Sequence, residues 1–422
     1  MLAPLLNDLS NAVEIYLVGG AVRDRLLGLP VKEQDWVVIG ETSESMLDKG
    51  FRSVGKDFPV FLHPKTHEEY ALARTERKTA PGYKGFKVYA ASDVTLEQDL
   101  IRRDLTINAM ALSPQGQLID PYGGQHDLEQ RIFRHVSPAF AEDPVRILRL
   151  ARFAARYAHL GFTLAEETLM LMQAMVAAGE VDHLVPERVW AELFKALNEK
   201  SPSAFFHILK DCSALNIIFP EIQALFGVPQ PEKYHPEIDT GVHVMMCLEQ
   251  AALLSVNPEV RFAVLVHDLG KGVTPKVEWP HHYGHETLGL PVLEKLCNRL
   301  RVPNTFKSLA LQVMQYHTHC HQVFDLRAST LTDMLTALGA HKPSNKLPDF
   351  LLACEADSKG RTGLENTLYP QAELLRGAAS ALSSIDTSSV MDGALQGPQI
   401  GEAIRRLRIK AVAEFVALYG KH

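Results

Sequence analysis

The chain has 422 residues, of which 46% are hydrophobic, 22% charged and 8% aromatic, and this composition excludes collagen-like and low-complexity proteins. At about 150 residues per domain, the length predicts roughly two to four domains. The net charge of −7 argues against a protein that binds nucleic acid through a general coat of lysine, although it allows a local basic site.

The cysteines and the hydropathy pattern argue against disulfide-rich, secreted and membrane-spanning proteins. The five cysteines lie far apart without a CxxC pair, which argues against a disulfide framework and a cysteine-rich zinc site. We therefore expect a reducing, cytoplasmic location. No apolar run approaches the roughly 18 to 20 residues that span a bilayer, and the N-terminus does not resemble a secretory signal, so we expect no membrane association.

Residues 15–135 have the pattern of a mixed α/β unit. Ala21–Leu27 predicts a short helix that ends at Gly28-Leu29-Pro30, and the first 14 residues predict a short helical prefix. Short runs of β-branched and aromatic residues predict the strands. These strands are Ile15–Val18, Trp36–Ile39, Val60–Leu62 and Glu69–Ala73.

After Pro138 the pattern becomes helical, and prolines in first-turn positions fit helix starts. Arg376–Gly401 is rich in Ala, Ser and Gly and predicts a loose linker, followed by a last helix over Ile404–Leu418. The other predicted helices are Ala141–Ala158, Glu166–Ala178, Pro186–Leu197, Pro202–Cys212, Val242–Leu254, Val260–Leu269, Gly289–Leu300 and Phe306–His317.

A glycine turn and a carboxylate pair form the first candidate site. A strand that runs into Gly19-Gly20 at a helix start brings bare backbone N–H groups to a phosphate, and Arg23 adds a cation. Residues i and i+2 of a strand share a face, so Glu33 and Asp35 can bind the same Mg²⁺ ions. Two such ions can activate a hydroxyl and hold departing phosphates. The alternative is a solvated turn, which the upstream glycine pair disfavours.

An arginine-only stretch follows. From Ile101 to Arg156 there are eight arginines and no lysine. The planar guanidinium is favoured where a phosphate or a base edge is held by two hydrogen bonds. A solvated helix face paired with acids is the alternative, but the missing lysines favour a functional stretch. Four of these arginines recur at helical spacing on one face: Arg146, Arg149, Arg152 and Arg156.

Histidines dominate the second half of the chain, where ten of the 18 lie between His235 and His341. Imidazole mixed with carboxylate is typical of a transition-metal site, and a bound metal can generate a nucleophile for phosphate esters from water. The alternative is that these histidines only pack or face solvent. The candidates are His243, His267-Asp268 and Asp357, with His281, His282, His285 and His317 as further possibilities.

Three motifs in this order resemble class II tRNA nucleotidyltransferases, the CCA-adding enzymes of the polymerase-β-like superfamily. They are Leu17–Arg23 with Glu33-x-Asp35, Arg102–Ala109, and Glu142–Arg146. The pattern of His243, His267-Asp268 and Asp357 resembles HD-superfamily phosphohydrolases. The resemblance covers nearly the whole chain and is strongest to bacterial members of gammaproteobacterial type. One departure is Glu33, where the family often has Asp; the added methylene is expected to alter its reach but to preserve metal binding.

The resemblance implies an α+β fold in four parts. Residues 1–137 would form a polymerase-β-like nucleotidyltransferase head, and residues 138–228 a helical neck that selects nucleotides and binds RNA. Residues 229–345 would form a helical HD phosphohydrolase domain, and residues 346–422 a C-terminal helical tail region.

The implied function is template-independent addition of CCA to the tRNA 3′ end from CTP and ATP, with pyrophosphate release. The HD domain would add 2′,3′-cyclic phosphodiesterase, 2′-nucleotidase and phosphatase activity. Glu33 and Asp35 would be catalytic ligands of Mg²⁺, with Glu69 as a third carboxylate. His267 and Asp268 would be catalytic in the HD site, where nickel or another transition metal is held with His243 and Asp357. The implied nucleotide-binding residues are Gly20, Arg23, Arg103, Asp143, Arg146, Arg149 and Arg152.

Asp143 and Arg146 can distinguish bases because they present an acceptor and a donor together. Cytosine and adenine each show an amino donor beside a ring-nitrogen acceptor, whereas guanine and uracil show a carbonyl and a ring N–H. Guanine or uracil would leave both side chains without hydrogen-bond partners, which makes the rejection of these two bases strong. The expected partners are tRNA, CTP and ATP, and the expected assembly is a monomer or a homodimer.

Three alternatives stay open. A poly(A) polymerase of the same family would use ATP alone, although the HD region and the lack of a long basic tail before His422 disfavour it. An RNA-binding metal phosphohydrolase would not need the intact Glu33, Asp35 and Arg23. A purely structural tRNA-binding protein would need neither set of metal ligands.

Overall fold

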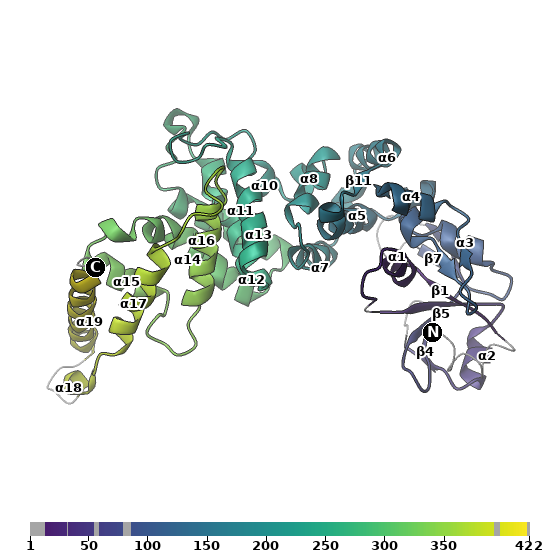
Figure 1. Cartoon of the computed structure of the whole chain (residues 1–422), viewed down its shortest axis with the longest axis horizontal. Coiled ribbons are helices and arrows are strands. Elements are labelled where there is room, and N and C mark those ends of the chain that lie inside the picture. Colours follow the sequence, from purple (N-terminus) through teal and green to yellow (C-terminus); the bar gives the residue numbers. More distant parts are fainter. Residues whose placement is uncertain (1–12, 32, 55–58, 79–85, 392–396, 420–422) are drawn as a thin grey trace. The chain divides into compact units, whose positions relative to one another are not determined.

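The computed structural model describes residues 13–31, 33–54, 59–78, 86–391 and 397–419 (Figure 1). Its contacts divide the chain into two compact units. The N-terminal unit comprises Met1–Arg188 and His207–Ala214, and the C-terminal unit comprises Val189–Phe206 and Leu215–His422. The predicted helical prefix falls mainly on residues 1–12, outside the described residues, and Glu14 already belongs to the first strand.

The N-terminal unit is built on a seven-stranded sheet with the order β3-β4-β5-β2-β1-β8-β9. β2 and β5 run parallel, and the other neighbouring strands run antiparallel. Alternation along β1 exposes Glu14 and buries Ile15 and Leu17, as the period of two requires. The strands are β1 (Glu14–Val18), β2 (Asp35–Ile39), β3 (Arg52–Ser53), β4 (Val60–Leu62), β5 (Glu69–Leu72), β8 (Ala111–Leu112) and β9 (Leu118–Ile119).

Helices and two small ribbons complete this unit. Capping boxes start α2 and α3, where Thr42 and Thr95 each exchange hydrogen bonds with the residue three positions later. The two-stranded ribbons are β6 (Thr75–Lys78) with β7 (Phe86–Tyr89), and β10 (Ile132–Phe133) with β11 (Thr163–Leu164). The helices are α1 (Gly20–Leu26), α2 (Ser43–Asp48), α3 (Leu96–Ile101), α4 (Gly124–Gln130), α5 (Val145–Tyr157) and α6 (Glu166–Ala177).

α5 begins later than its sequence pattern predicts. A helix was expected from Ala141, but Pro138–Glu142 forms a 3₁₀ turn and α5 starts at Val145. Pro144 is the cause, because a proline disfavours the helical conformation of the residue before it. Asp143 accordingly has an extended backbone, with φ −124° and ψ 108°.

The C-terminal unit is helical. α12 packs against α11, α14 and α16, and every residue of Val260–Val266 in α12 is buried. The unit boundary falls within α7 (Pro186–Leu197) and α8 (Ser203–Asp211). The remaining helices are α9 (Leu215–Ile218), α10 (Pro220–Gln223), α11 (Thr240–Leu254), α12 (Pro258–Val266), α13 (His285–Leu300), α14 (Asn304–His321), α15 (Ala328–Ala337), α16 (Leu347–Lys359), α17 (Gln371–Ser383), α18 (Ser388–Met391) and α19 (Pro398–Tyr419).

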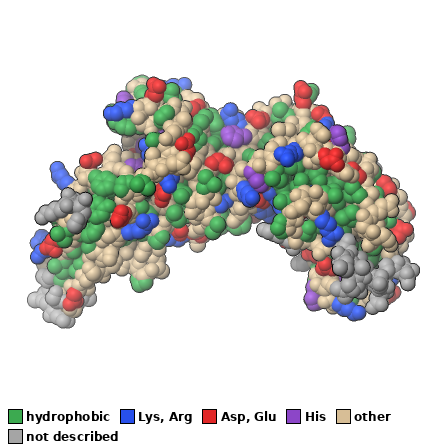
Figure 2. Space-filling model, viewed as in Figure 1, with side chains coloured by type: hydrophobic (Ala, Val, Ile, Leu, Met, Phe, Trp, Pro, Cys, Tyr) green, Lys and Arg blue, Asp and Glu red, His purple; other side chains and the backbone are tan. Residues whose placement is uncertain are grey.

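The prediction of a loose linker over Arg376–Gly401 is wrong for most of its described part, because α17 extends to Ser383 and α18 and the start of α19 follow. None of the described helices is both long and apolar enough to cross a bilayer. Basic and acidic side chains lie interspersed over the face of the molecule drawn in Figure 2.

Candidate active sites

The first site surrounds the turn between β1 and α1. Gly19 has a φ of +69°, and a Cβ there would lie 2.9 Å from Nη1 of Arg103. A Cβ on Gly20 would lie 3.3 Å from Nη2 of Arg23. The positive φ favours glycine at position 19, and two guanidinium groups lie against the turn.

Carboxylates gather at the neighbouring strand ends. Asp35 is the first residue of β2 and pairs with Val18 on one side and with Glu69 of β5 on the other. Glu33 lies two residues before β2, so the expectation that both Glu33 and Asp35 belong to the strand is wrong. Desolvation raises the pKa of Asp35, the Arg103 charge opposes this, and Glu33 adds to it. Exposed carboxylate oxygens of this kind are the ligands that Mg²⁺ prefers.

Asp99, which the sequence analysis missed, positions the arginine over the glycine turn. Its side chain is fully buried and pairs with Arg102 at 2.5 Å and with Arg103 at 3.1 Å. Burial alone would raise the pKa of Asp99, but the two guanidinium groups lower it. The charged carboxylate therefore holds Arg103 in place beside Gly19.

Arg23 is more deeply buried than a simple phosphate contact requires. Its side chain donates to Asp24 at 2.9 Å and to Asn108, and its guanidinium lies 5.0 Å from the ring centre of Phe153. Asp24 also accepts a hydrogen bond from Tyr157 at 2.7 Å. This network joins α1 to α5 behind the glycine turn.

The predicted arginine face of α5 exists, and each of its arginines has an identified contact. Arg149 donates to the buried Asp104 at 2.8 Å, and Arg156 donates to Asp24 at 2.8 Å. The Arg152 guanidinium lies 4.4 Å from the ring centre of the neighbouring Phe153. Arg146 is buried and donates to the backbone carbonyls of Ala139 and Arg102.

Asp143 has a partner that the sequence analysis did not identify. Arg188 of α7 donates to both of its oxygens, at 3.3 Å and 2.9 Å. Oδ1 of Asp143 also accepts the backbone N–H of Val145 at 3.0 Å. The carboxylate is thereby held at the start of α5, on the same turn as Arg146.

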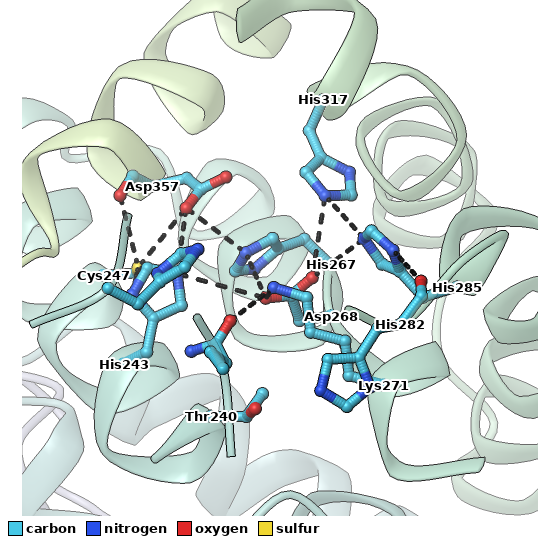
Figure 3. Close-up of polar contacts among 12 residues, drawn as sticks. Thr240, His243, Cys247, His267, Asp268, Lys271, His282, His285, His317 and Asp357 are labelled. Atoms are coloured by element: carbon cyan, nitrogen blue, oxygen red, sulfur yellow. Dashed lines mark hydrogen bonds and ion pairs between the residues drawn. The ribbon is translucent and has the colours of Figure 1, made fainter. Parts of the chain in front are cut away.

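The second site lies in the C-terminal unit, where polar side chains from several helices meet (Figure 3). His243 comes from α11, His267 and Asp268 directly follow α12, and Asp357 comes from α16. Nε2 of His243 lies 3.0 Å and Nε2 of His267 lies 3.5 Å from the same oxygen of Asp357. All four residues predicted as ligands therefore lie together, and all are buried.

The ring orientations fit a metal site. Nδ1 of His267 contacts the carbonyl of Val264 at 2.7 Å, and Nδ1 of His243 contacts the carbonyl of Gly360 at 3.1 Å. Because a carbonyl only accepts, Nδ1 carries the proton and the Nε2 lone pairs point inward. Nε2 of His267 faces carboxylate oxygens of Asp268 at 3.3 Å and of Asp357 at 3.5 Å. This donor set fits a borderline transition metal.

The charges of the histidines and carboxylates in this centre shift one another's pKa values. Burial favours the neutral imidazole of His267, but Asp268 and Asp357 outweigh it and raise the pKa of His267 to about 10. Burial would also raise the pKa of Asp357, yet the charges of His267 and His321 lower it well below its usual value. The centre therefore concentrates negative charge that a cation, whether proton or metal, must balance.

Several residues around this centre escaped the sequence analysis. Glu237 pairs with Nδ1 of His243 at 2.9 Å, and Cys247 Sγ lies 3.4 Å from Nε2 of the same ring. His321 contacts Oδ2 of Asp357 through Nε2 at 2.7 Å, and Tyr369 contacts Nδ1 of His321 at 2.9 Å. Glu237 and Cys247 lie near His243 in the chain but belong to no motif, and His321 and Tyr369 lie far along the chain from Asp357 or belong to no motif.

The further histidine candidates divide into two groups. His285 and His317 lie beside Asp268, at 3.3 Å and 3.6 Å. His282 contacts Thr274 and the carbonyl of Pro229 instead, and His281 stacks on Tyr283. Only the first group belongs to the candidate metal centre.

Comparisons with protein families give separate matches for the two parts of the chain that contain the candidate sites. Residues 15–134 match the family model described as "Poly A polymerase head domain". Residues 161–226 match "Probable RNA and SrmB-binding site of polymerase A", and residues 240–338 match "HD domain". The first model covers the glycine turn and the carboxylates, and the third covers His243, His267 and Asp268.

Solved structures share the fold. A CCA-adding enzyme in complex with ATP has a TM-score of 0.65 at 20% identity, covering 97% of this chain and 90% of that one. The Thermotoga maritima CCA-adding enzyme complexed with tRNA has a TM-score of 0.61 at 20% identity, covering 99% of this chain and 94% of that one. Together with the head-domain match over residues 15–134, this confirms the predicted α+β architecture.

Close relatives decide the family. The Multifunctional CCA protein of Methylococcus capsulatus is 64% identical over 401 residues, which cover 95% of this chain and 94% of that protein. The protein of the same name from Thioalkalivibrio sulfidiphilus is 59% identical, over 97% of this chain and 100% of that protein. The chain therefore belongs to the multifunctional CCA protein family and is an enzyme that combines a nucleotidyltransferase head with an HD domain.

Proposed function

We propose that the N-terminal unit adds the sequence CCA to the 3′ end of tRNA from CTP and ATP, without a template and with release of pyrophosphate. The observation that carries this proposal is the position of Asp35 and Glu69 at paired strand positions, beside the Gly19 turn and Arg103. A triphosphate seated on this turn would place its α-phosphate near the carboxylates. Phosphoryl transfer of this kind depends on positioning and electrostatic stabilisation.

Each residue has a role in this proposal. Glu33 and Asp35 would hold Mg²⁺, whose charge would favour ionisation of the attacking 3′-hydroxyl and would balance the leaving phosphates. Gly20 would bring its backbone N–H close to the nucleotide phosphates, and Arg23 and Arg103 would supply positive charge beside the turn. Arg149 and Arg152 would contact the nucleotide from α5. Glu69 would be a third carboxylate at the same strand end.

Asp143 and Arg146 would select the base. Both stand at the beginning of α5, where Asp143 accepts and Arg146 donates. Cytosine and adenine share the matching edge of an amino group beside a bare ring nitrogen. Uracil and guanine would leave both side chains unpaired, which penalises them strongly.

The test supplies a tRNA lacking its 3′ end, Mg²⁺ and each nucleoside triphosphate in turn, with product length read by gel electrophoresis. We expect two C and then one A to be added, after which extension stops. Continued addition of A alone would establish a poly(A) polymerase instead. No incorporation of any nucleotide would leave only an RNA-binding phosphohydrolase and would overturn the proposal.

For the HD domain we propose hydrolysis of 2′,3′-cyclic phosphates, 2′-nucleotides and other phosphate monoesters. His243, His267, Asp268 and Asp357 would hold nickel or another transition metal, which lowers the pKa of bound water. Lys271 lies 2.7 Å from Asp268 and could neutralise an incoming phosphate oxygen. The test is release of 2′- or 3′-nucleotide from a 2′,3′-cyclic nucleotide with Ni²⁺ present, and no turnover at any tested metal concentration would refute it.

The proposal also includes the domain bounds, the cellular location, the assembly and the partners of the protein. We retain the division into a head at 1–137, a neck at 138–228, an HD domain at 229–345 and a tail region at 346–422. We propose a cytoplasmic enzyme that acts as a monomer or a homodimer, with tRNA, CTP and ATP as its partners.

A further inference from the structure

An exposed pair of aromatic rings lies in the loop that leads into α13. The ring centres of His281 and Tyr283 are 5.7 Å apart and their planes differ by 19°, which is a stacked arrangement. Both residues are exposed, Tyr283 to 71%. The imidazole therefore supports the phenol ring, and most of the phenol ring remains open to solvent.

The loop backbone fixes the outward direction of this pair. His282, between the two rings, points inward and is 2% exposed. Its Nε2 lies 2.8 Å from the carbonyl oxygen of Pro229, and its Nδ1 lies 2.6 Å from Oγ1 of Thr274. His282 and Gly284 both have positive φ, 52° and 69°. A non-glycine residue keeps this conformation where surrounding contacts enforce it, so the loop is built to present its two rings.

The loop joins the histidine centre directly. Nδ1 of His285 contacts the carbonyl of His282 at 3.0 Å, and Nε2 of His285 lies 3.3 Å from Oδ1 of Asp268 (Figure 3). Tyr283 is two residues before His285, so their Cα atoms lie within about 8 Å of each other. In a nucleotide, only the ribose separates the base from a 2′-phosphate. A nucleotide with its phosphate at the centre can therefore bring its base to Tyr283.

A buried amide on the same side of the centre also lacks a partner. Gln230 follows Pro229 and is 2% exposed. Its Oε1 accepts from Nζ of Lys271 at 2.5 Å, and the same Nζ lies 2.7 Å from Oδ2 of Asp268. Within the part of the chain that the structure describes, Nε2 of Gln230 has no hydrogen-bond partner. A buried donor is costly without an acceptor, and a phosphate oxygen of a bound substrate would provide one.

We propose that the HD domain recognises a nucleoside phosphate by stacking its base on Tyr283, while Nε2 of Gln230 donates to a phosphate oxygen. Every base has a π face, so this platform accepts any base but gains nothing from a phosphate ester that lacks one. The inference rests on the proposed HD activity and names the residue that makes this activity favour nucleotides.

Tyr234 is a second exposed aromatic residue near the centre, but its surroundings differ. It precedes His235, whose ring centre lies 4.6 Å from that of His243. Nζ of Lys233 lies 5.1 Å from the ring centre of Tyr234, so an ammonium group already occupies a position against this ring. Tyr234 therefore serves as the aromatic control for Tyr283.

The first experiment compares two phosphate monoesters of secondary alcohols, 2′-AMP and glycerol 2-phosphate, with the nickel-loaded full chain. Phosphate release gives kcat and KM for each. In Tyr283→Ala we expect kcat/KM to fall about 10-fold for 2′-AMP, mainly through KM, and less than about twofold for glycerol 2-phosphate. Tyr283→Phe should behave as the wild type, because its ring still stacks. Val277→Ala, at a 92% exposed position of the same loop, should change neither substrate.

Gln230→Glu tests the second contact, because it keeps an oxygen for Lys271 but replaces the N–H donor with an acceptor. We expect kcat/KM to fall about 10-fold for both substrates, since both carry the phosphate. Unchanged kinetics in this variant would overturn the role of Gln230.

The second experiment measures binding without catalysis. Tyr283→Trp protein, stripped of metal, is titrated with 2′-AMP or glycerol 2-phosphate, and the wild-type chain supplies the background fluorescence. A base stacked on the new indole should quench its emission, so we expect quenching by 2′-AMP only. Absence of this quenching would overturn the stacking proposal.

Equal losses for the two substrates in Tyr283→Ala would also overturn it, as would a loss for 2′-AMP in Tyr234→Ala as large as in Tyr283→Ala. Quenching by 2′-AMP without hydrolysis by the nickel-loaded wild type would refute the proposed HD activity alone. Hydrolysis of 2′-AMP that Tyr283→Ala leaves unchanged would refute the stacking site alone.

Discussion

At the residue scale, Asp143 and Arg146, the pair proposed to select the base, are held by different kinds of contact. Arg146 donates to two backbone carbonyls, which fix its guanidinium at the helix start. Asp143 pairs with Arg188, a side chain that reaches it from another helix. A base that pairs with Asp143 must therefore share or displace Arg188. If Asp143 and Arg146 select the base as proposed, Arg188 is a third residue on which that selection would depend.

Replacing Asp143 by Ala should lower the preference for CTP over UTP by about 10- to 100-fold, because the amino group of cytosine loses its acceptor. The change should affect choice more than overall incorporation, since the carboxylates of the metal site are untouched. The measurement compares kcat/KM for the two nucleotides on a tRNA lacking its end.

Arg188→Gln is the companion variant, because it leaves the Asp143 carboxylate in place but removes its charged partner. We expect a smaller loss of discrimination there than in Asp143→Ala. Full discrimination against UTP and GTP in both Asp143→Ala and Arg146→Ala would contradict the assigned role of this pair.

At the element scale, the small residues of α17 explain why the sequence predicted a linker. A segment rich in Ala, Ser and Gly has little apolar area of its own, yet Ala378 and Ala379 are buried. A Cβ on Gly377 would lie 2.1 Å from the Phe415 ring of α19. Small side chains therefore serve close packing between these helices, and a pattern based on large apolar residues does not detect this.

Gly377→Ala and Gly401→Ala form a matched pair on α17 and α19. Each substitution should stabilise its helix by up to about 1 kcal/mol, because alanine has a higher helix propensity than glycine. No atom lies within 4 Å of the new Cβ at Gly401. At Gly377 the displaced Phe415 ring should cost about 1 to 3 kcal/mol. We expect hydrogen exchange of the α19 amides to accelerate in Gly377→Ala and to slow in Gly401→Ala. Equal effects in the two variants would show that α19 does not depend on this contact.

At the scale of the whole molecule, each compact unit contains one complete candidate site. The glycine turn, the carboxylates and the arginine face belong to the N-terminal unit, and the histidine centre belongs to the C-terminal unit. Each site draws on helices or strands of its own unit. The two activities should therefore be separable by substitution.

His267→Ala combined with Asp268→Ala should abolish phosphate-ester hydrolysis, with CCA addition remaining within about twofold, because no ligand of the other site is changed. The reciprocal variant, Glu33→Gln with Asp35→Asn, should lose nucleotide addition by more than about 100-fold and keep hydrolysis. Both activities are measured on each full-length variant. Loss of both activities in either variant, with the fold intact by circular dichroism, would show that the sites depend on each other.

Much of this protein follows from its sequence alone, because neighbouring residues carry local structure and motif chemistry. The strands before Gly19 and at Asp35, the helix over Pro186–Leu197 and the adjacent His267 and Asp268 are examples. Their periodicity and spacing specify the backbone and the buried face without reference to distant residues.

The tertiary structure alone decided which distant groups support these motifs. Asp99 holds Arg103, Arg188 holds Asp143, and the pair of His321 and Tyr369 holds Asp357. It also decided that His285 and His317, unlike His281 and His282, face Asp268. Such pairings join residues from different elements, so they depend on how the helices pack, and no local pattern of hydrophobicity or charge records that packing.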